Sequence, residues 1–182
     1  MFNHLIEMFP EDFVYKPRIR SSICNLLHNY LERHNKSLII RFCVRFPTEH
    51  QPGRKEISRF IETLKHELQK NYLDPSYIWV REQVTSEHPH FHVVFFVNGN
   101  KVQNPTAIYQ LAEMLWNVTL NTNYGGLVEF ERYCSVRKCD YDYPQQLEYA
   151  INMLSYIAKD FSKGPINDGY RDFGMTRTPR YA

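Results

Sequence analysis

The sequence predicts an α+β fold built on an antiparallel sheet, and two observations carry this prediction. Segments with alternating apolar residues, typical of strands, are interspersed with segments whose apolar residues recur every three or four positions, typical of helices. Their order along the chain is strand, helix, strand, strand, helix, strand. This order is typical of a ferredoxin-like palm, or split βαβ arrangement, with two helices on one face of the sheet.

The first part of the chain supplies an arm, two helices and a strand. Residues 1–36 are expected to form an irregular arm followed by a helix that Ser21 or Ser22 caps. Residues 37–47 read SLIIRFCVRFP, in which alternate residues are apolar, so a strand is predicted. Residues 54–72 carry an apolar stripe at helical spacing and predict an amphipathic helix.

The remaining elements follow in the same order. Strands are expected at residues 77–84 and 90–98, and the next helix has Asn104 as a cap and Pro105 at its first position. Residues 126–133 predict the fourth strand.

One more helix completes the prediction. A tyrosine-bearing helix at residues 144–161 is expected to cover the face of the sheet that the two other helices leave free. We expect a single domain over residues 1–182, with a core at 37–161 and a basic tail at 162–182.

Composition narrows the class of protein. A hydrophobic content of 43% and a charged content of 23% indicate a globular chain and exclude a disordered one. Four cysteines without paired zinc spacing, and no apparent signal peptide, lead us to expect a reduced, cytoplasmic protein. No segment approaches the roughly 18 apolar residues of a membrane helix, so no membrane partner is expected. A net charge of +2 permits nucleic-acid binding without requiring it.

Two histidines open the strand predicted at residues 90–98. His90 and His92 flank Phe91, so both imidazoles point to one side of the strand, as a shared metal ion requires. An isolated pair of this kind more often consists of hydrogen-bonded strand residues. This pair, however, lies where an apolar strand reaches the rim of the sheet, and a metal ion would satisfy both imidazoles there.

A third metal ligand is expected from the neighbouring strand. With a hairpin loop at residues 85–89, Glu82 faces His92 and places a carboxylate beside both imidazoles. A one-residue bulge would turn Glu82 to the other face, and His88 in the loop is the alternative ligand or a phosphate contact. Two imidazoles and one carboxylate are compatible with Mn²⁺, Mg²⁺ or Zn²⁺, although Mg²⁺ prefers oxygen ligands.

The predicted tyrosine helix carries Tyr149 and Tyr156 on the side away from its apolar stripe. Such tyrosines can simply pack their rings and leave their hydroxyls in water. Beside a metal site they acquire a chemical use, because a phenol with a pKa near ~10 needs a base or a positive charge to act as a nucleophile. Lys159, three residues after Tyr156, supplies such a charge, and the metal ion would polarise a scissile phosphate.

The motif HFH at residues 90–92, followed by YIAK at residues 156–159, resembles the HUH endonucleases, whose motifs are His-hydrophobic-His and Y-x-x-K. Within that superfamily the chain looks most like the replication initiators of filamentous-phage (inovirus) type and their prophage-encoded relatives, over about residues 37 to 178. The resemblance implies a metal-dependent nickase that initiates rolling-circle replication. Tyr156 would join the 5′ phosphate of nicked single-stranded DNA, and Tyr149 would serve a second strand transfer.

Single-stranded DNA, at an origin or a hairpin, is the partner that the resemblance implies. Arg41 and Arg45 on the free sheet face, with Arg171 and Arg177 in the tail, are the expected DNA contacts. The chain lacks a G-x-x-x-x-G-K-[ST] phosphate loop, so a host helicase is expected to unwind the duplex.

Three other functions fit the same elements. A non-catalytic module for single-stranded nucleic acid would use sheet aromatics for stacking, but it leaves the paired histidines unexplained and the chain has no RNP-like motif. An HUH-type transposase would share the chemistry and differ in its DNA target. A captured prophage protein that has lost activity would serve as a regulator.

Overall fold

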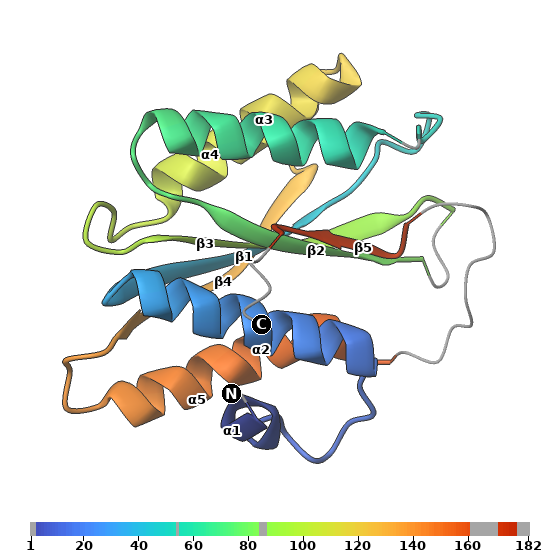
Figure 1. Cartoon of the computed structure of the whole chain (residues 1–182). Coiled ribbons are helices and arrows are strands. Elements are labelled where there is room, and N and C mark those ends of the chain that lie inside the picture. Colours follow the sequence, from blue (N-terminus) through green and yellow to red (C-terminus); the bar gives the residue numbers. More distant parts are fainter. Residues whose placement is uncertain (1–2, 54, 84–86, 161–170, 178–182) are drawn as a thin grey trace.

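The computed structural model describes residues 3–53, 55–83, 87–160 and 171–177. Its centre is an antiparallel sheet of five strands in the order β4-β1-β3-β2-β5 (Figure 1). The strands are β1 (Lys36–Val44), β2 (Ser76–Glu82), β3 (His90–Asn98), β4 (Val128–Arg137) and β5 (Phe173–Met175). The order of strands and helices along the chain is that of a ferredoxin-like palm, so the predicted α+β fold is confirmed.

Helices cover both faces of this sheet. They are α1 (Asn3–Glu7), α2 (Pro17–Arg33), α3 (Glu56–Lys70), α4 (Thr106–Leu120) and α5 (Tyr143–Ser155), with a 3₁₀ turn, η1, at Tyr156–Ala158. Figure 1 shows α3 and α4 on one face, and α2 and α5 on the other. The positions of α3 and α4 on one face and of α5 on the other agree with the prediction. The predicted N-terminal helix, α2, lies beside α5, and this position was not predicted. Each face therefore has its own hydrophobic core.

Two helix boundaries differ from the prediction. The helix expected to be capped by Ser21 or Ser22 already begins at Pro17, because proline suits the first helical position. The helix expected at residues 144–161 ends at Ser155 and continues only as η1. The predicted helices, strands and tail also extend over residues 54, 84, 161–170 and 178–182, which lie outside the described residues. Within the described part of the chain, no helix has both the length and the apolar character needed to cross a membrane.

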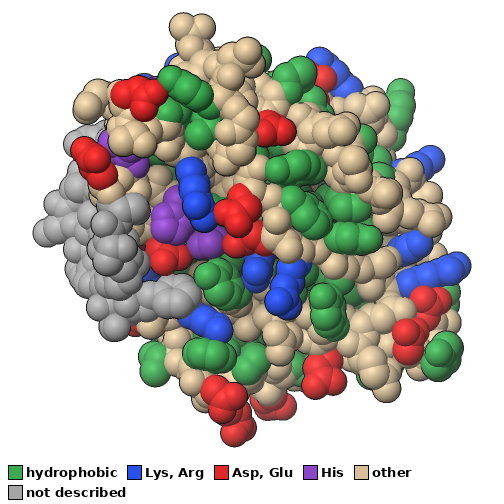
Figure 2. Space-filling model, turned by 180° about the vertical axis from the view of Figure 1, so that it is seen from behind, with side chains coloured by type: hydrophobic (Ala, Val, Ile, Leu, Met, Phe, Trp, Pro, Cys, Tyr) green, Lys and Arg blue, Asp and Glu red, His purple; other side chains and the backbone are tan. Residues whose placement is uncertain are grey.

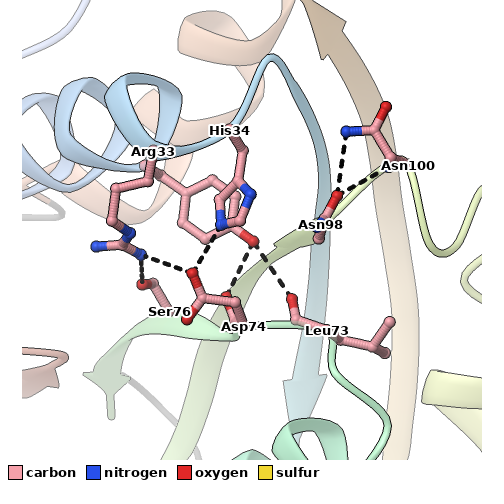
Figure 3. A network of polar contacts seen from close by, with 8 residues as sticks. Arg33, His34, Leu73, Asp74, Ser76, Asn98 and Asn100 are labelled. Atoms are coloured by element: carbon pink, nitrogen blue, oxygen red, sulfur yellow. Dashed lines mark hydrogen bonds and ion pairs between the residues drawn. The ribbon is translucent and has the colours of Figure 1, made fainter.

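A polar network fixes α2 at the end of the sheet away from the histidines (Figure 3). Asp74 lies 2.7 Å from His34 and 3.5 Å from Arg33, both near the C-terminal end of α2. The Tyr30 hydroxyl donates a hydrogen bond to the backbone oxygen of Asp74 at 3.0 Å. Asp74 has a positive φ of 42°, which is unfavourable for a residue with a side chain. The network therefore stabilises a strained turn between α3 and β2.

The strand β5 was not predicted, and a glycine explains how it fits. Gly174 pairs with Trp79 of β2, and a Cβ atom at Gly174 would lie 2.6 Å from the Trp79 Nε1 atom. No residue with a side chain allows so close an approach without displacement. β5 therefore depends on glycine at this position.

Gly174→Ala is expected to lower the free energy of unfolding by about 1–3 kcal/mol, because the added methyl group overpacks against the buried Trp79. Urea denaturation measures this change, and tryptophan fluorescence detects displacement of β5. Gly125→Ala is the matched control, since a Cβ atom there meets nothing within 4 Å. Equal stability of the two variants would contradict the proposed close packing.

Candidate active site

Polar side chains gather at one end of the sheet, on the face that α2 and α5 cover. Alternate residues of β3, such as Val94 and Phe96, belong to the hydrophobic core of this face. The same alternation places His92 and His90 on this face as β3 approaches the rim. On the molecular surface in Figure 2, histidine side chains lie next to acidic side chains and to Lys or Arg side chains. The side chains of β3 on this face therefore change from apolar to polar at the candidate site.

His90, His92 and Glu82 form a convergent set of donor atoms. The Glu82 Oε2 atom lies 2.9 Å from the His92 Nε2 atom and 3.5 Å from the His90 Nε2 atom. Ligand atoms bonded at about 2.1 Å to one divalent ion are about 3.0–3.4 Å apart in octahedral or tetrahedral geometry. The distances from Glu82 to the two imidazoles are close to this range, so Glu82 is a candidate metal ligand beside His90 and His92.

Glu82 reaches the site in a different register from the predicted one. It pairs with His90, and Val80 pairs with His92. The predicted loop at residues 85–89 would have paired Glu82 with His92, so this detail of the prediction is wrong. The shift is two residues, an even number, and an even shift leaves a side chain on the same face of the sheet. The carboxylate consequently lies beside both imidazoles, as expected.

Cys43 offers an alternative third donor. The Cys43 Sγ atom, one ring nitrogen of His90 and one ring nitrogen of His92 all lie within 4.8 Å of one another. Burial raises the pKa of the Cys43 thiol to about 11, so this group is neutral at pH 7 in the metal-free protein. A thiolate ligand would favour Zn²⁺ over Mn²⁺ or Mg²⁺. The other alternative, His88, directs its Nε2 atom to the backbone oxygen of Thr48 at 2.7 Å.

Glu131 of β4 holds His92 from the opposite side. Its Oε1 atom lies 3.3 Å from the His92 Nδ1 atom. A carboxylate on Nδ1 orients the imidazole and leaves Nε2 for a metal ion. Burial alone would lower the pKa of His92, but the hydrogen bonds with Glu131 and Glu82 outweigh it, and the pKa is raised. Hydrogen bonds from His90 and His92 in turn hold the pKa of Glu82 well below its usual range.

A bulge in β4 brings Glu131 to this face. Arg41 of β1 pairs with Arg132. Phe42, the next residue of β1, pairs with Phe130, which leaves Glu131 as an extra residue. An extra residue reverses the alternation of faces beyond it. No periodic pattern in the sequence marks the bulge, so Glu131 was not predicted as a site residue.

Arg41 connects Glu131 to the tyrosine. Its Nε atom lies 2.9 Å from the Glu131 Oε2 atom, and its guanidinium also donates a 2.7 Å hydrogen bond to the backbone oxygen of Met153. The guanidinium carbon lies 4.5 Å from the centre of the Tyr156 ring. Arg41, which we expected to contact DNA, is only 7% exposed. Its contacts make it a residue that positions Tyr156 and Glu131.

Tyr156 itself lies against the histidine pair. The centres of the Tyr156 and His92 rings are 5.3 Å apart, and the rings meet edge to face. Burial raises the pKa of the Tyr156 hydroxyl, and the nearby carboxylates of Glu82 and Glu131 add to this effect. Ionisation of the phenol therefore needs additional positive charge at the site. The structure thus brings together the tyrosine and the histidines that the sequence singled out.

The N-terminal arm holds the turn that carries Tyr156. The Lys16 amide donates a 2.8 Å hydrogen bond to the Ala158 oxygen, and Tyr15 forms a β-bridge with Lys159. The Lys159 Nζ atom lies 3.2 Å from the centre of the Phe13 ring and 5.5 Å from that of Tyr156. The arm was predicted to be irregular, and its contact through Phe13 was not predicted, because Phe13 and Lys159 are far apart along the chain.

The other predicted site residues lie further out. Tyr149 is 50% exposed on α5, about 10 Å along the helix axis from Tyr156 at 1.5 Å per residue. Arg45 is exposed, pairs with Glu129 at 2.7 Å, and lines a hollow of about 350 Å³ that extends to His90. The tail arginines Arg171 and Arg177 are exposed on either side of β5. The remainder of the predicted basic tail, at 162–170 and 178–182, lies outside the described residues.

Two arginine–glutamate ion pairs on this face, Arg41–Glu131 and Arg45–Glu129, differ in how far they are buried. Arg41→Met is expected to lower the free energy of unfolding by about 3 kcal/mol, because it removes the guanidinium beside the buried Glu131 carboxylate and leaves His92 as the partner of that carboxylate. Arg45→Met is the matched control: both side chains of its ion pair are more than half exposed, so we expect a loss below about 1 kcal/mol. Urea denaturation of both variants measures the difference. Similar losses would show that the Arg41 pair is no stronger than a surface pair.

Comparison with known proteins identifies the family of this chain. No curated protein and no solved structure matches the chain. The model of the YagK/YfjJ C-terminal domain matches residues 15–176. This range includes β1 to β5, the histidine pair and η1. Because the match covers most of the chain, the protein belongs to the YagK/YfjJ C-terminal domain family.

Proposed function

We propose that this protein is a metal-dependent endonuclease that nicks single-stranded DNA through a covalent link to Tyr156. One observation carries the proposal: the Tyr156 ring lies 5.3 Å from that of His92, whose Nε2 atom converges with His90 on the Glu82 carboxylate. Separately, the histidine pair and the tyrosine turn are common features. Their contact supports a nucleophile that acts next to a divalent ion held by the histidines.

The residues of the candidate site would have different roles in phosphodiester cleavage. His90, His92 and Glu82 would hold Mn²⁺, Mg²⁺ or Zn²⁺, which supplies Lewis acidity at the scissile phosphate when bound. The Tyr156 oxygen forms a bond to phosphorus as the P–O3′ bond breaks. The phenol loses its proton, and the departing 3′ oxygen becomes a hydroxyl. Lys159, at 5.5 Å from the Tyr156 ring, adds the positive charge that the phenolate requires.

The covalent product also supports strand transfer. One ester bond to phosphorus replaces another, so a 3′ hydroxyl can later attack the tyrosine-linked 5′ phosphate and rejoin DNA. Tyr149 is the candidate for a second cut. We further propose an origin or hairpin as the substrate, initiation of rolling-circle replication as the role, a host helicase as partner and the cytoplasm as location. This setting is supported by the resemblance of the two motifs to those of inovirus-type initiators.

Covalent capture of DNA tests the proposal. The protein is incubated with Mn²⁺ and a pool of single-stranded oligonucleotides that include hairpins, and the products are separated on a denaturing gel. A label at the DNA 3′ end should migrate with the protein, because the 5′ phosphate of that fragment is attached to tyrosine. A label at the 5′ end should appear in a free fragment with a 3′ hydroxyl. Absence of any adduct with Mn²⁺, Mg²⁺ or Zn²⁺ would favour a non-catalytic binding module.

The structure also bears on the binding-module alternative. An RNA-recognition type of module needs an open sheet face on which bases stack. Here α3 and α4 cover one face, and α2 and α5 cover the other (Figure 1). This arrangement gives nuclease chemistry at the rim more support than stacking on the sheet. A transposase would give the same adduct. Sequencing of the captured DNA distinguishes a transposase from a replication initiator, because their DNA targets differ.

A further inference from the structure

A second hollow, of about 580 Å³, lies between the start of α2 and β5. We call it the α2–β5 hollow. Its lining includes three cationic side chains, one acidic side chain and one aromatic ring, namely Lys16, Arg18, Arg171, Asp172 and Phe173. The volume is within the range of about 300–1,000 Å³ that small-molecule sites occupy in proteins. The hollow is therefore large enough for one nucleotide unit.

Both walls of this hollow are tied to the candidate active site. On one wall, the Lys16 amide donates a hydrogen bond to the Ala158 oxygen at 2.8 Å, in the turn that carries Tyr156. On the other wall, the Asp172 oxygen accepts a hydrogen bond of 2.7 Å from the amide of Arg81, the residue before Glu82. One wall of the hollow is thus bonded to the turn that carries Tyr156, and the other wall is bonded to the strand that carries Glu82.

The lining combines the two kinds of side chain that bind single-stranded nucleic acid, namely cations and an aromatic ring. The Arg18 guanidinium lies 5.0 Å from the centre of the Phe173 ring, so a cation and an aromatic face are already paired. Proteins hold single strands by stacking bases on aromatic rings and by placing cations along the phosphates. The exposed arginines Arg18 and Arg171 can reach a strand from solvent. Three cations against one carboxylate leave the lining positively charged.

We propose that the α2–β5 hollow binds a nucleotide of the DNA strand beside the scissile phosphate. Its base stacks against Phe173, and its backbone phosphate lies among Lys16, Arg18 and Arg171. The inference rests on the proposed function for the identity of the strand, but it requires binding alone and no cleavage.

A binding assay in which no cleavage can occur tests this inference separately from the proposed nuclease activity. Fluorescence anisotropy of a labelled oligonucleotide is measured with Tyr156→Phe protein in EDTA, so that no adduct forms. Adding Arg18→Glu and Arg171→Glu should weaken binding at least tenfold. It should also make the slope of log K against log salt shallower by about 1.4, at about 0.7 for each lost phosphate contact. Phe173→Leu should weaken binding about tenfold through loss of stacking.

The matched control carries the same charge change elsewhere. Arg59→Glu with Lys101→Glu alters exposed residues of α3 and of the turn after β3, and should leave affinity within about twofold. Circular dichroism verifies that each variant is folded. Equal affinities of the hollow variant and the control would overturn the inference. Displacement of the strand by an equal concentration of deoxynucleoside monophosphate would also overturn it, in favour of a free-nucleotide site.

The adduct assay separates this inference from the proposed function. Weakened binding in the hollow variants, with no adduct from the unmodified protein, would retain the hollow as a DNA site and reject the nickase. Full adduct formation by protein carrying only the hollow substitutions, with unchanged affinity, would reject the hollow and retain the nickase.

Discussion

Tyr156→Phe is expected to abolish the covalent protein–DNA adduct, because the substitution removes the attacking oxygen and keeps the ring. The ring contacts with His92 and Arg41 depend on the aromatic face, so the variant should fold normally. Single-stranded DNA should therefore still bind, which anisotropy measures. Loss of the adduct with binding retained would assign Tyr156 as the nucleophile.

Tyr149→Phe is the matched control for this experiment. Tyr149 lies on the same helix segment but is half exposed, two turns before the site. The variant should form the first adduct at the normal rate. If Tyr149 makes the second cut, only the later joining of strands should fail. An adduct that persists in Tyr156→Phe and disappears in Tyr149→Phe would transfer the nucleophile to Tyr149.

His92→Ala is expected to give the second largest effect, a loss of metal-dependent cleavage of about 100-fold or more. Even residues that only orient metal ligands typically change metal affinity or activity by 10–100-fold, and His92 is proposed as a ligand itself. Calorimetric titration with Mn²⁺ should show the loss of affinity directly. His88→Ala is the control, since the His88 ring contacts the Thr48 oxygen and should be dispensable for the metal. Unchanged cleavage by His92→Ala would reject the metal site.

Two further variants identify the third ligand. Glu82→Gln keeps the shape of the side chain and removes its charge, so it should weaken Mn²⁺ binding strongly. Cys43→Ser should leave Mn²⁺ binding unchanged, because a neutral buried thiol is a poor ligand for a hard ion. The opposite pattern, with Zn²⁺ bound through Cys43, would assign the thiolate in place of the carboxylate.

The parts of the site that follow from local periodicity were predictable. His90 and His92 share a face because two residues is the period of a strand, and Glu82 stayed on that face because the register error was even. Glu131 was not predictable, since a single bulged residue reverses the faces without leaving a pattern. The same holds for Phe13, which meets Lys159 only through tertiary packing.

The ends of elements were harder to predict than their existence. The helix that carries the tyrosine was predicted, but its change to a 3₁₀ turn at Tyr156 was not. Backbone contacts from Lys16 to Ala158 hold that turn, and they come from a distant segment. The strand β5 has three residues, too few for an alternating pattern, and it pairs only because Gly174 fits against Trp79. Tertiary contacts decided each of these features.

The contact between the arm and the tyrosine turn has a consequence for biosynthesis. A chain that emerges from the ribosome exposes Lys16 first, then the histidine pair, then Tyr156, and Arg171 last. The metal ligands are thus complete before the nucleophile exists, and the α2–β5 hollow closes later still. A nascent chain with the proposed activity would therefore contain its metal ligands and its nucleophile before it contains the residues of β5.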